Sequence, residues 1–104
     1  MKYLMLLLFV ALVAAVPTPR YTVVMKNDAY SPTSLTIPVG ATVTFVNQDD
    51  DAHTVTSTNG WFDSKGLDSS GVWRHTFSKA GTYMYFCELH PFMKGKIVVK
   101  AVTP

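Results

Sequence analysis

The sequence predicts an all-β domain, a sandwich or barrel of about seven to eight short strands. Three observations support this prediction. Short runs rich in β-branched and aromatic residues recur along the chain, and clusters of Gly, Pro, Ser, Asn and Asp separate them. Beyond the N-terminal segment, no stretch has the apolar spacing of an amphipathic helix. The length allows only one small domain.

The expected strands follow in order from these runs. They are residues 21–26, 35–38, 41–47, 53–57, 72–77, 82–87 and 96–102. Alternation in residues 41–47 places Val43 and Phe45 on one face and Thr42 and Thr44 on the other. A turn region containing Pro32 follows the first strand, and a long Gly/Ser/Asp-rich connection occupies residues 58–71.

The first 15 residues have the composition of a secretory signal peptide. Lys2 precedes a short apolar run, and small residues, Val13 and Ala15, end it. A membrane-spanning helix needs roughly 20 apolar residues, so the run is short for that role. We expect residues 1–15 to be removed, leaving residues 16–104 as an exported, periplasmic or otherwise extracytoplasmic domain. An uncleaved membrane anchor is the competing interpretation.

Charge and cysteine content narrow the function classes. The net charge is +2, and loss of Lys2 with the signal peptide reduces it to +1. Without a basic stripe carrying interleaved aromatic residues, a nucleic-acid partner is not expected. Cys87 is the single cysteine, so an internal disulfide is impossible. In an oxidising compartment a lone thiol points to an intermolecular bridge or to a functional role, and metal ligation would protect it from oxidation.

Cys87, His90 and Met93 follow one another at intervals of three residues and offer a thiolate, an imidazole and a thioether. Two imidazoles and one thiolate with a weak axial methionine form a type 1 (blue) copper site. The missing imidazole would come from elsewhere in the fold, and His53 is the natural candidate. The sequence therefore predicts one copper ion bound by His53, Cys87, His90 and Met93.

Three other interpretations of these residues are chemically conceivable. Cys87 and Met93 could be ordinary core residues, although the joint spacing argues against it. Zinc could use two histidines and a cysteine, but a thioether is a poor zinc ligand. A Cys-His hydrolase would need an oriented base and an oxyanion hole, and nothing in the sequence supplies them. His75 is the remaining histidine, and we expect it to be a buried or edge residue with a hydrogen-bond partner.

Residues 81–99, which contain the Cys-x2-His-x2-Met spacing, resemble the C-terminal copper loop of the cupredoxins, in the short form of the amicyanins. The similarity extends through residues 45–47, 51–55 and 62–64 and covers essentially the whole mature chain. It implies an antiparallel Greek-key β-sandwich and the same four ligands. It also implies a soluble one-electron carrier that works as a monomer and is not an enzyme. Its partners would be a redox donor and acceptor, for which the family resemblance suggests a c-type cytochrome or an amine dehydrogenase. Copper delivery or storage is the alternative function.

The sequence departs from the family pattern at two positions. Thr54 stands where relatives often have Asn, whose side chain ties two ligand loops together; we expect the shorter Thr to give a looser tether. His75 stands where relatives usually have an apolar residue. Asn47 is interpreted either as a brace for the ligands or as a plain turn residue. Tyr83 resembles a tyrosine corner, a structural role.

Overall fold

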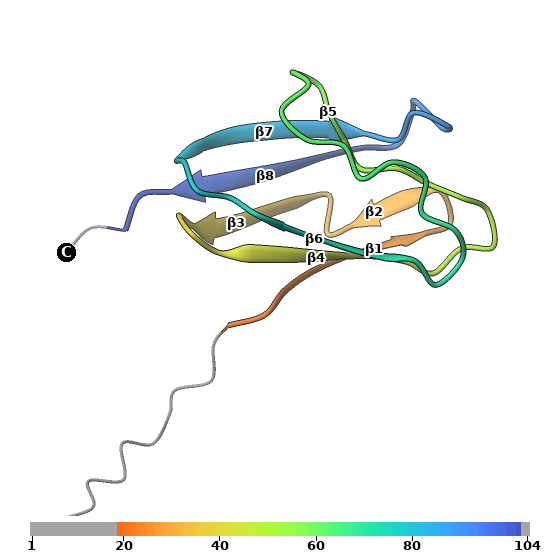
Figure 1. Cartoon of the computed structure of the whole chain (residues 1–104), viewed down its shortest axis with the longest axis horizontal. Coiled ribbons are helices and arrows are strands. Elements are labelled where there is room, and N and C mark those ends of the chain that lie inside the picture. The colour runs from red at the N-terminus through yellow and green to blue at the C-terminus, as the bar shows by residue number, and fades with distance from the viewer. Residues whose placement is uncertain (1–18, 103–104) are drawn as a thin grey trace, which may run out of the picture.

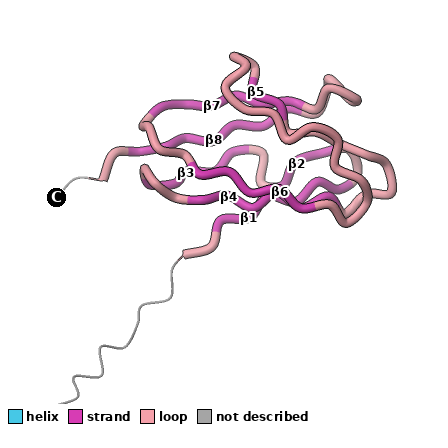
Figure 2. The backbone as a smooth tube through the Cα atoms, in the orientation of Figure 1, coloured by secondary structure: helices cyan, strands magenta, loops and turns pink. Residues whose placement is uncertain are grey.

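The computed structural model describes residues 19–102, so the predicted signal peptide lies outside the described residues. Within this range every regular element is a strand (Figures 1 and 2). The eight strands are β1 (Tyr21–Lys26), β2 (Ala29–Ser31), β3 (Ser34–Pro38), β4 (Thr42–Asn47), β5 (Thr56–Ser57), β6 (Val72–Thr76), β7 (Gly81–Phe86) and β8 (Lys94–Lys100). No helix in this range is long and apolar enough to cross a bilayer. The all-β prediction is confirmed.

The strands form two four-stranded sheets packed face to face. One sheet has the order β2-β1-β4-β6 and the other has the order β3-β8-β7-β5 (Figure 1). Both are mixed, because β1 pairs with β4 in parallel and β3 pairs with β8 in parallel. The prediction of an antiparallel sandwich is therefore correct for only some of the strand pairs in each sheet. The chain leaves the first sheet after β2, crosses to the second for β3, and returns to the first with β4 running alongside β1.

Strand β2 is the element that the sequence prediction missed. Residues 27–34 were expected to be a turn region containing Pro32, but residues 29–31 form this strand. Asn27 and Asp28 both have positive φ angles, 54° and 55°, which is the geometry of a two-residue hairpin turn that matches the strand twist. Asn and Asp tolerate this geometry better than most residues. The pair lacks the usual glycine, and this made the hairpin hard to predict.

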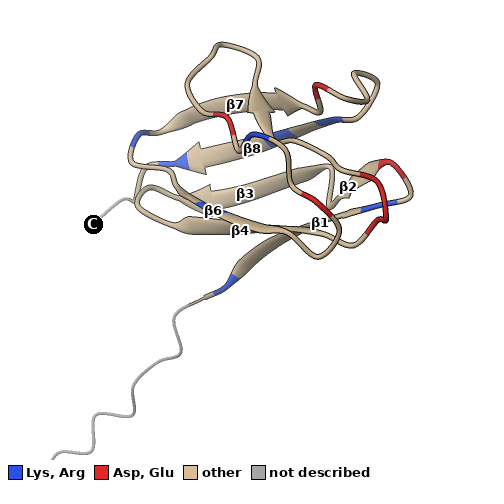
Figure 3. Cartoon of the chain, turned by 45° about the vertical axis from the view of Figure 1, so that its right-hand side comes forward, with Lys and Arg blue, Asp and Glu red and all other residues tan. Residues whose placement is uncertain are grey.

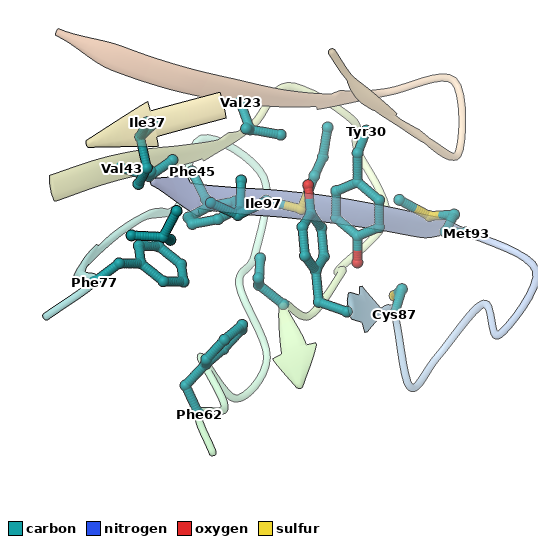
Figure 4. Packing of buried hydrophobic residues seen from close by; sticks show 14 residues of the cluster. Val23, Tyr30, Ile37, Val43, Phe45, Phe62, Phe77, Cys87, Met93 and Ile97 are labelled. Carbon is teal, nitrogen blue, oxygen red and sulfur yellow. The ribbon is translucent and has the colours of Figure 1, made fainter. Parts of the chain in front are cut away.

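The core lies between the sheets and follows the alternation of the strands. Val43 and Phe45 on β4, which were predicted to share one face, are fully buried, and so is Ile97 on β8. The remaining buried apolar side chains are Val23, Met25, Tyr30, Ile37, Val55, Phe62, Phe77, Tyr85, Cys87, Met93 and Val99 (Figure 4). Cys87 and Met93 thus belong to the continuous core, at one end of it.

The long connection, residues 58–71, packs against the segment that carries His53. The main chains of His53 and Leu67 exchange two hydrogen bonds, of 3.1 and 2.8 Å. Thr56 forms a second bridge with Asp63, and the Ser64 N–H donates to the carbonyl of Val55. The strand expected over residues 53–57 is therefore regular only in β5, because its first half pairs with a loop. That loop fixes the position of His53.

Candidate metal centre

Three predicted ligands converge at one end of the sandwich. The Nδ1 atoms of His53 and His90 lie 3.2 Å apart, and the Cys87 Sγ lies 3.7 Å from the first and 3.8 Å from the second. His53 precedes β5, Cys87 directly follows β7, and His90 lies on the loop between β7 and β8. His53 and Cys87 are fully buried, and His90 is half-buried. Residues 37 positions apart in sequence thus present their donor atoms to one point.

The triangle of donor atoms fits a single metal ion. A point in its plane lies about 2.1 Å from all three atoms, close to the roughly 2.0–2.3 Å at which imidazole nitrogen and thiolate sulfur bind a first-row metal. The donor set consists of two nitrogens and one sulfur in a trigonal arrangement. Such a set with a soft sulfur donor favours copper, particularly when a thioether lies nearby.

Met93 lies next to this triangle. Its side chain is 2 % exposed, and Figure 4 shows it at the same end of the core as Cys87 and Tyr30. Two backbone hydrogen bonds close the loop on which it lies. The Met93 N–H donates to the His90 carbonyl at 2.8 Å, and the Cys87 N–H donates to the Met93 carbonyl at 3.1 Å. The loop is therefore a compact turn closed by its own backbone hydrogen bonds.

Thr54 joins the two segments that carry the ligands. Its N–H donates to the Cys87 sulfur at 3.2 Å, and its Oγ1 accepts the Glu88 N–H at 2.8 Å. A backbone N–H directed at a thiolate stabilises the negative charge on the sulfur. The shorter Thr side chain does tether the two segments, because their backbones approach closely enough for its hydroxyl to reach Glu88.

Asp49 binds the outer nitrogen of His53. Its Oδ2 lies 2.8 Å from His53 Nε2, and a carboxylate only accepts, so Nε2 carries the proton and Nδ1 is left free for a metal. The Asn27 and Asp28 N–H groups donate to the same carboxylate at 2.7 and 3.0 Å. These bonds, led by that from Asp28 and then that from His53, hold the pKa of Asp49 below its usual value. This role of Asp49 was not predicted from the sequence, where its one signal is the four-residue spacing from Asp49 to His53.

The Asn47 side chain braces the loops around His53. Its side chain is fully buried, and its Nδ2 donates to the carbonyls of Asp51 and Leu67, both at 2.9 Å. Its Oδ1 accepts the Asp49 N–H at 2.9 Å. One amide thus joins the loop before His53 to the loop that pairs with His53. Of the two interpretations, the brace is the correct one.

His75 lies away from the donor atoms, as expected for a residue that is not a ligand. Its ring stacks on Trp73 with centroids 5.2 Å apart and packs edge-on against Phe77 at 4.8 Å. In the part of the chain that the structure describes, its imidazole forms no hydrogen bond with a protein group, contrary to expectation. Burial lowers its pKa. It lines a groove of about 540 Å³ with Trp61 and Tyr83, separate from the metal centre.

Tyr83 has the structural role that the sequence indicated. Its hydroxyl donates to the Lys79 carbonyl at 2.6 Å, which ties the start of β7 to the turn before it. This geometry, a tyrosine bonded to the backbone a few residues upstream, is that of a tyrosine corner.

Comparisons with known proteins agree with this geometry. Residues 2–99 match the sequence profile of the family described as the cupredoxin-like domain. Amicyanin from Paracoccus versutus is 34% identical over 92 residues, which cover 84% of this chain and 70% of that protein.

Two solved structures extend the likeness to three dimensions. A proline-to-glycine variant of amicyanin in its reduced Cu(I) form at pH 4 is similar with a TM-score of 0.75 and 33% identity, over 84% of this chain and 88% of that one. A copper-containing nitrite reductase from Thermus scotoductus has a TM-score of 0.77 and 33% identity, over 85% of this chain but 24% of its own length. On this evidence the chain is a member of the cupredoxin family.

Proposed function

We propose that the protein is a blue copper protein that carries single electrons between redox partners outside the cytoplasm. Its cofactor is one copper ion, as in the amicyanin to which it is similar. His53, Cys87 and His90 would be the equatorial ligands and Met93 the axial one. The observation that carries this proposal is the triangle of two imidazole nitrogens and one thiolate sulfur, all within 3.8 Å of one another.

When bound, copper supplies a one-electron couple between Cu(I) and Cu(II). The residues of the chain supply a cavity that changes little between the two states. Thr54 fixes the distance between the ligand segments, Asn47 fixes the loops around His53, and the two backbone bonds between Cys87, His90 and Met93 fix the ligand loop. A pre-organised site lowers the structural rearrangement that each transfer would otherwise require.

His90 is the proposed exit for electrons. It is the exposed member of the donor triangle, and its neighbours on the loop are apolar. Leu89 is 56 % exposed and Phe92 is 69 % exposed. An apolar surface of this kind around a half-exposed ligand suits brief docking, in which a small interface forms and releases quickly.

Several carboxylates also lie at the end of the sandwich that carries the metal centre. Asp28 is on the turn between β1 and β2, and Asp49, Asp50 and Asp51 precede His53. Figure 3 displays acidic residues at the end of the sandwich where β1 leads into β2. Such a cluster beside the exit would steer a partner with a basic surface toward it and raise the association rate at low salt. By family resemblance, the partners are a c-type cytochrome or an amine dehydrogenase.

Copper delivery or storage is the alternative function. A delivery protein needs ligands that exchange metal readily, which favours exposed sulfur groups. Here Cys87 is fully buried and Met93 is 2 % exposed, and they come from a loop closed by backbone hydrogen bonds. This enclosure favours the electron carrier.

We also propose that the chain is not itself an enzyme. It has three histidines. Two of them contribute to the donor triangle and His75 packs in the aromatic groove, so no histidines are left for a second copper centre. The similarity to nitrite reductase fits this view, because the chain covers only 24% of that protein.

The deciding experiment is to load the purified protein with Cu(II) and record its visible spectrum and voltammogram. A type 1 site gives an intense charge-transfer band, due to the thiolate, and a reversible one-electron wave. Cys87→Ser is the matched control, since it keeps the size of the side chain and removes the thiolate; it should bleach the band. A colourless wild type that exchanges copper rapidly would instead indicate delivery. Sequencing the N-terminus of the exported protein tests cleavage after Ala15.

A further inference from the structure

A chain of hydrogen bonds connects the turn between β1 and β2 to the buried ligand His53, and Asp49 is its centre. One carboxylate oxygen of Asp49 receives His53 Nε2 at 2.8 Å, while the two oxygens receive the Asn27 and Asp28 N–H groups at 2.7 and 3.0 Å. Both turn residues have positive φ, which directs two successive N–H groups to the same side as an anion-binding nest. The two turn N–H groups therefore fix the Asp49 carboxylate in a position from which it binds the His53 imidazole.

A second carboxylate lies near the same nitrogen. Asp28 Oδ1 is 3.5 Å from His53 Nε2, so two negative charges lie against the outer edge of one ligand. The His53 side chain is fully buried and that of Asp49 is 16 % exposed, which limits screening by solvent. Carboxylate oxygens of Asp28 and Asp51 also lie within 4.8 Å of a ring nitrogen of His90. Within residues 19–102, however, no carboxylate forms a hydrogen bond with His90, so of these two histidines only His53 receives a carboxylate bond.

We propose that Asp49 is a positioning residue that sets the reduction potential of the copper centre. This inference rests on the proposed function and deepens it. A carboxylate that accepts the Nε2 proton of His53 fixes the tautomer and ring orientation and makes Nδ1 a stronger donor. Its negative charge also favours the more positive metal state, Cu(II) over Cu(I). Asp49 thus keeps the potential lower than the four ligands alone would give, and Asp28 contributes a smaller effect in the same direction.

The test compares Asp49→Asn with Asp50→Asn. The first variant keeps the side-chain size and removes the charge that binds His53. The second removes an exposed charge one residue away that has no contact with His53 and so corrects for overall charge. Loss of an outer partner of a metal ligand typically costs 10–100-fold in affinity. We expect Asp49→Asn to weaken Cu(II) binding about tenfold relative to Cu(I), which raises the midpoint potential by about 59 mV. Asp50→Asn should change it by much less.

A metal-free measurement separates this role from a general loss of structure. Nitrogen NMR of the apo-protein should find His53 with its proton on Nε2 in the wild type and in Asp50→Asn, and a mixture of tautomers in Asp49→Asn. Asp49→Glu, which keeps the charge, should restore part of the wild-type potential. If Asp49→Asn fails to fold, Asp28→Asn decides: a potential above that of Asp50→Asn supports the proposal, and an equal potential overturns it.

The outcomes also separate this inference from the proposed function. A wild type with no blue colour contradicts the copper carrier itself. A blue wild type whose potential is the same in Asp49→Asn and Asp50→Asn leaves the carrier intact and overturns the role of Asp49.

Discussion

The backbone N–H of Thr54 donates to the sulfur of Cys87 across 3.2 Å, and the two residues lie 33 positions apart in the chain. The Thr54 hydroxyl makes the reciprocal connection by accepting the Glu88 N–H. The segment of the first proposed ligand and the loop of the other proposed ligands are therefore held in register by bonds between protein groups.

Thr54→Val keeps the shape of the side chain and removes the acceptor for the Glu88 N–H. The same change also removes the buried hydrogen bond between the Thr54 and Thr56 hydroxyls, whereas the bond to the Glu88 N–H is partly buried. A buried polar group without a partner costs about 1–3 kcal/mol, so we expect a loss of about this size in the free energy of unfolding of the apo-protein, measured in urea. Thr54→Ser, which retains the hydroxyl, is the control and should lose less. Equal stability of Thr54→Val and wild type would contradict a structural role for this bond.

Met93 can be tested as the axial ligand through the potential. Met93→Leu should retain the colour and raise the midpoint potential, because loss of the thioether disfavours Cu(II) more than Cu(I). Met93→Gln introduces a harder oxygen donor and should lower it. Voltammetry of both variants at one pH suffices. If neither variant differs from wild type, Met93 is a core residue and not a ligand.

Phe92 tests the proposed docking surface. Phe92→Asp places a charge in the apolar patch beside His90, so we expect the rate of electron transfer to the partner to fall while the visible spectrum stays the same. Trp61→Asp is the matched control, because Trp61 is similarly exposed (62 % against 69 %) and lines the groove away from the metal centre. Rates should also depend on ionic strength through the carboxylates. Equal slowing in both variants would argue against a specific patch.

Gly95 is predicted to be intolerant of a side chain. It pairs with Tyr85 across β7 and β8, and a Cβ at this position would lie 2.4 Å from the tyrosine ring. The ring is buried and packs edge-on against Tyr30, so it cannot easily move. Gly95→Ala should cost about 1–3 kcal/mol in the free energy of unfolding. Gly66→Ala, where a Cβ meets nothing within 4 Å, is the control and should have little effect.

His75 should make stability depend on pH. Burial lowers its pKa in the folded state below the ordinary value of 6.5. Between these two values the unfolded chain binds more protons than the folded one, so stability rises with pH in that window and is fully present above about 6.5. His75→Gln does not titrate and should show a smaller loss of unfolding free energy between pH 7.5 and pH 5.5. Identical slopes for the variant and the wild type would show that His75 is protonated equally in both states.

The fold was largely predictable, because each long strand is a run of β-branched and aromatic residues bounded by turn residues. Local pattern could not predict β2, which is three residues long, or the parallel pairs, which arise because the chain changes sheets between β2 and β3. The identities of the three converging donor residues followed from residue type, spacing and the resemblance to the cupredoxins. The partner of His53 did not, since Asp49 reaches it through a turn geometry that only the folded backbone reveals.

The proposed ligand residues come from two segments that the fold brings together, so copper supply should affect the stability and turnover of the protein. A metal bound by both segments stabilises only the folded chain, by an amount that grows with the free metal concentration relative to its dissociation constant. Chains that have not acquired copper therefore open more often at this end and expose Cys87 to oxidation and the backbone to proteases. We expect the steady-state level of the protein to follow copper supply, so that turnover removes the copies that cannot carry electrons.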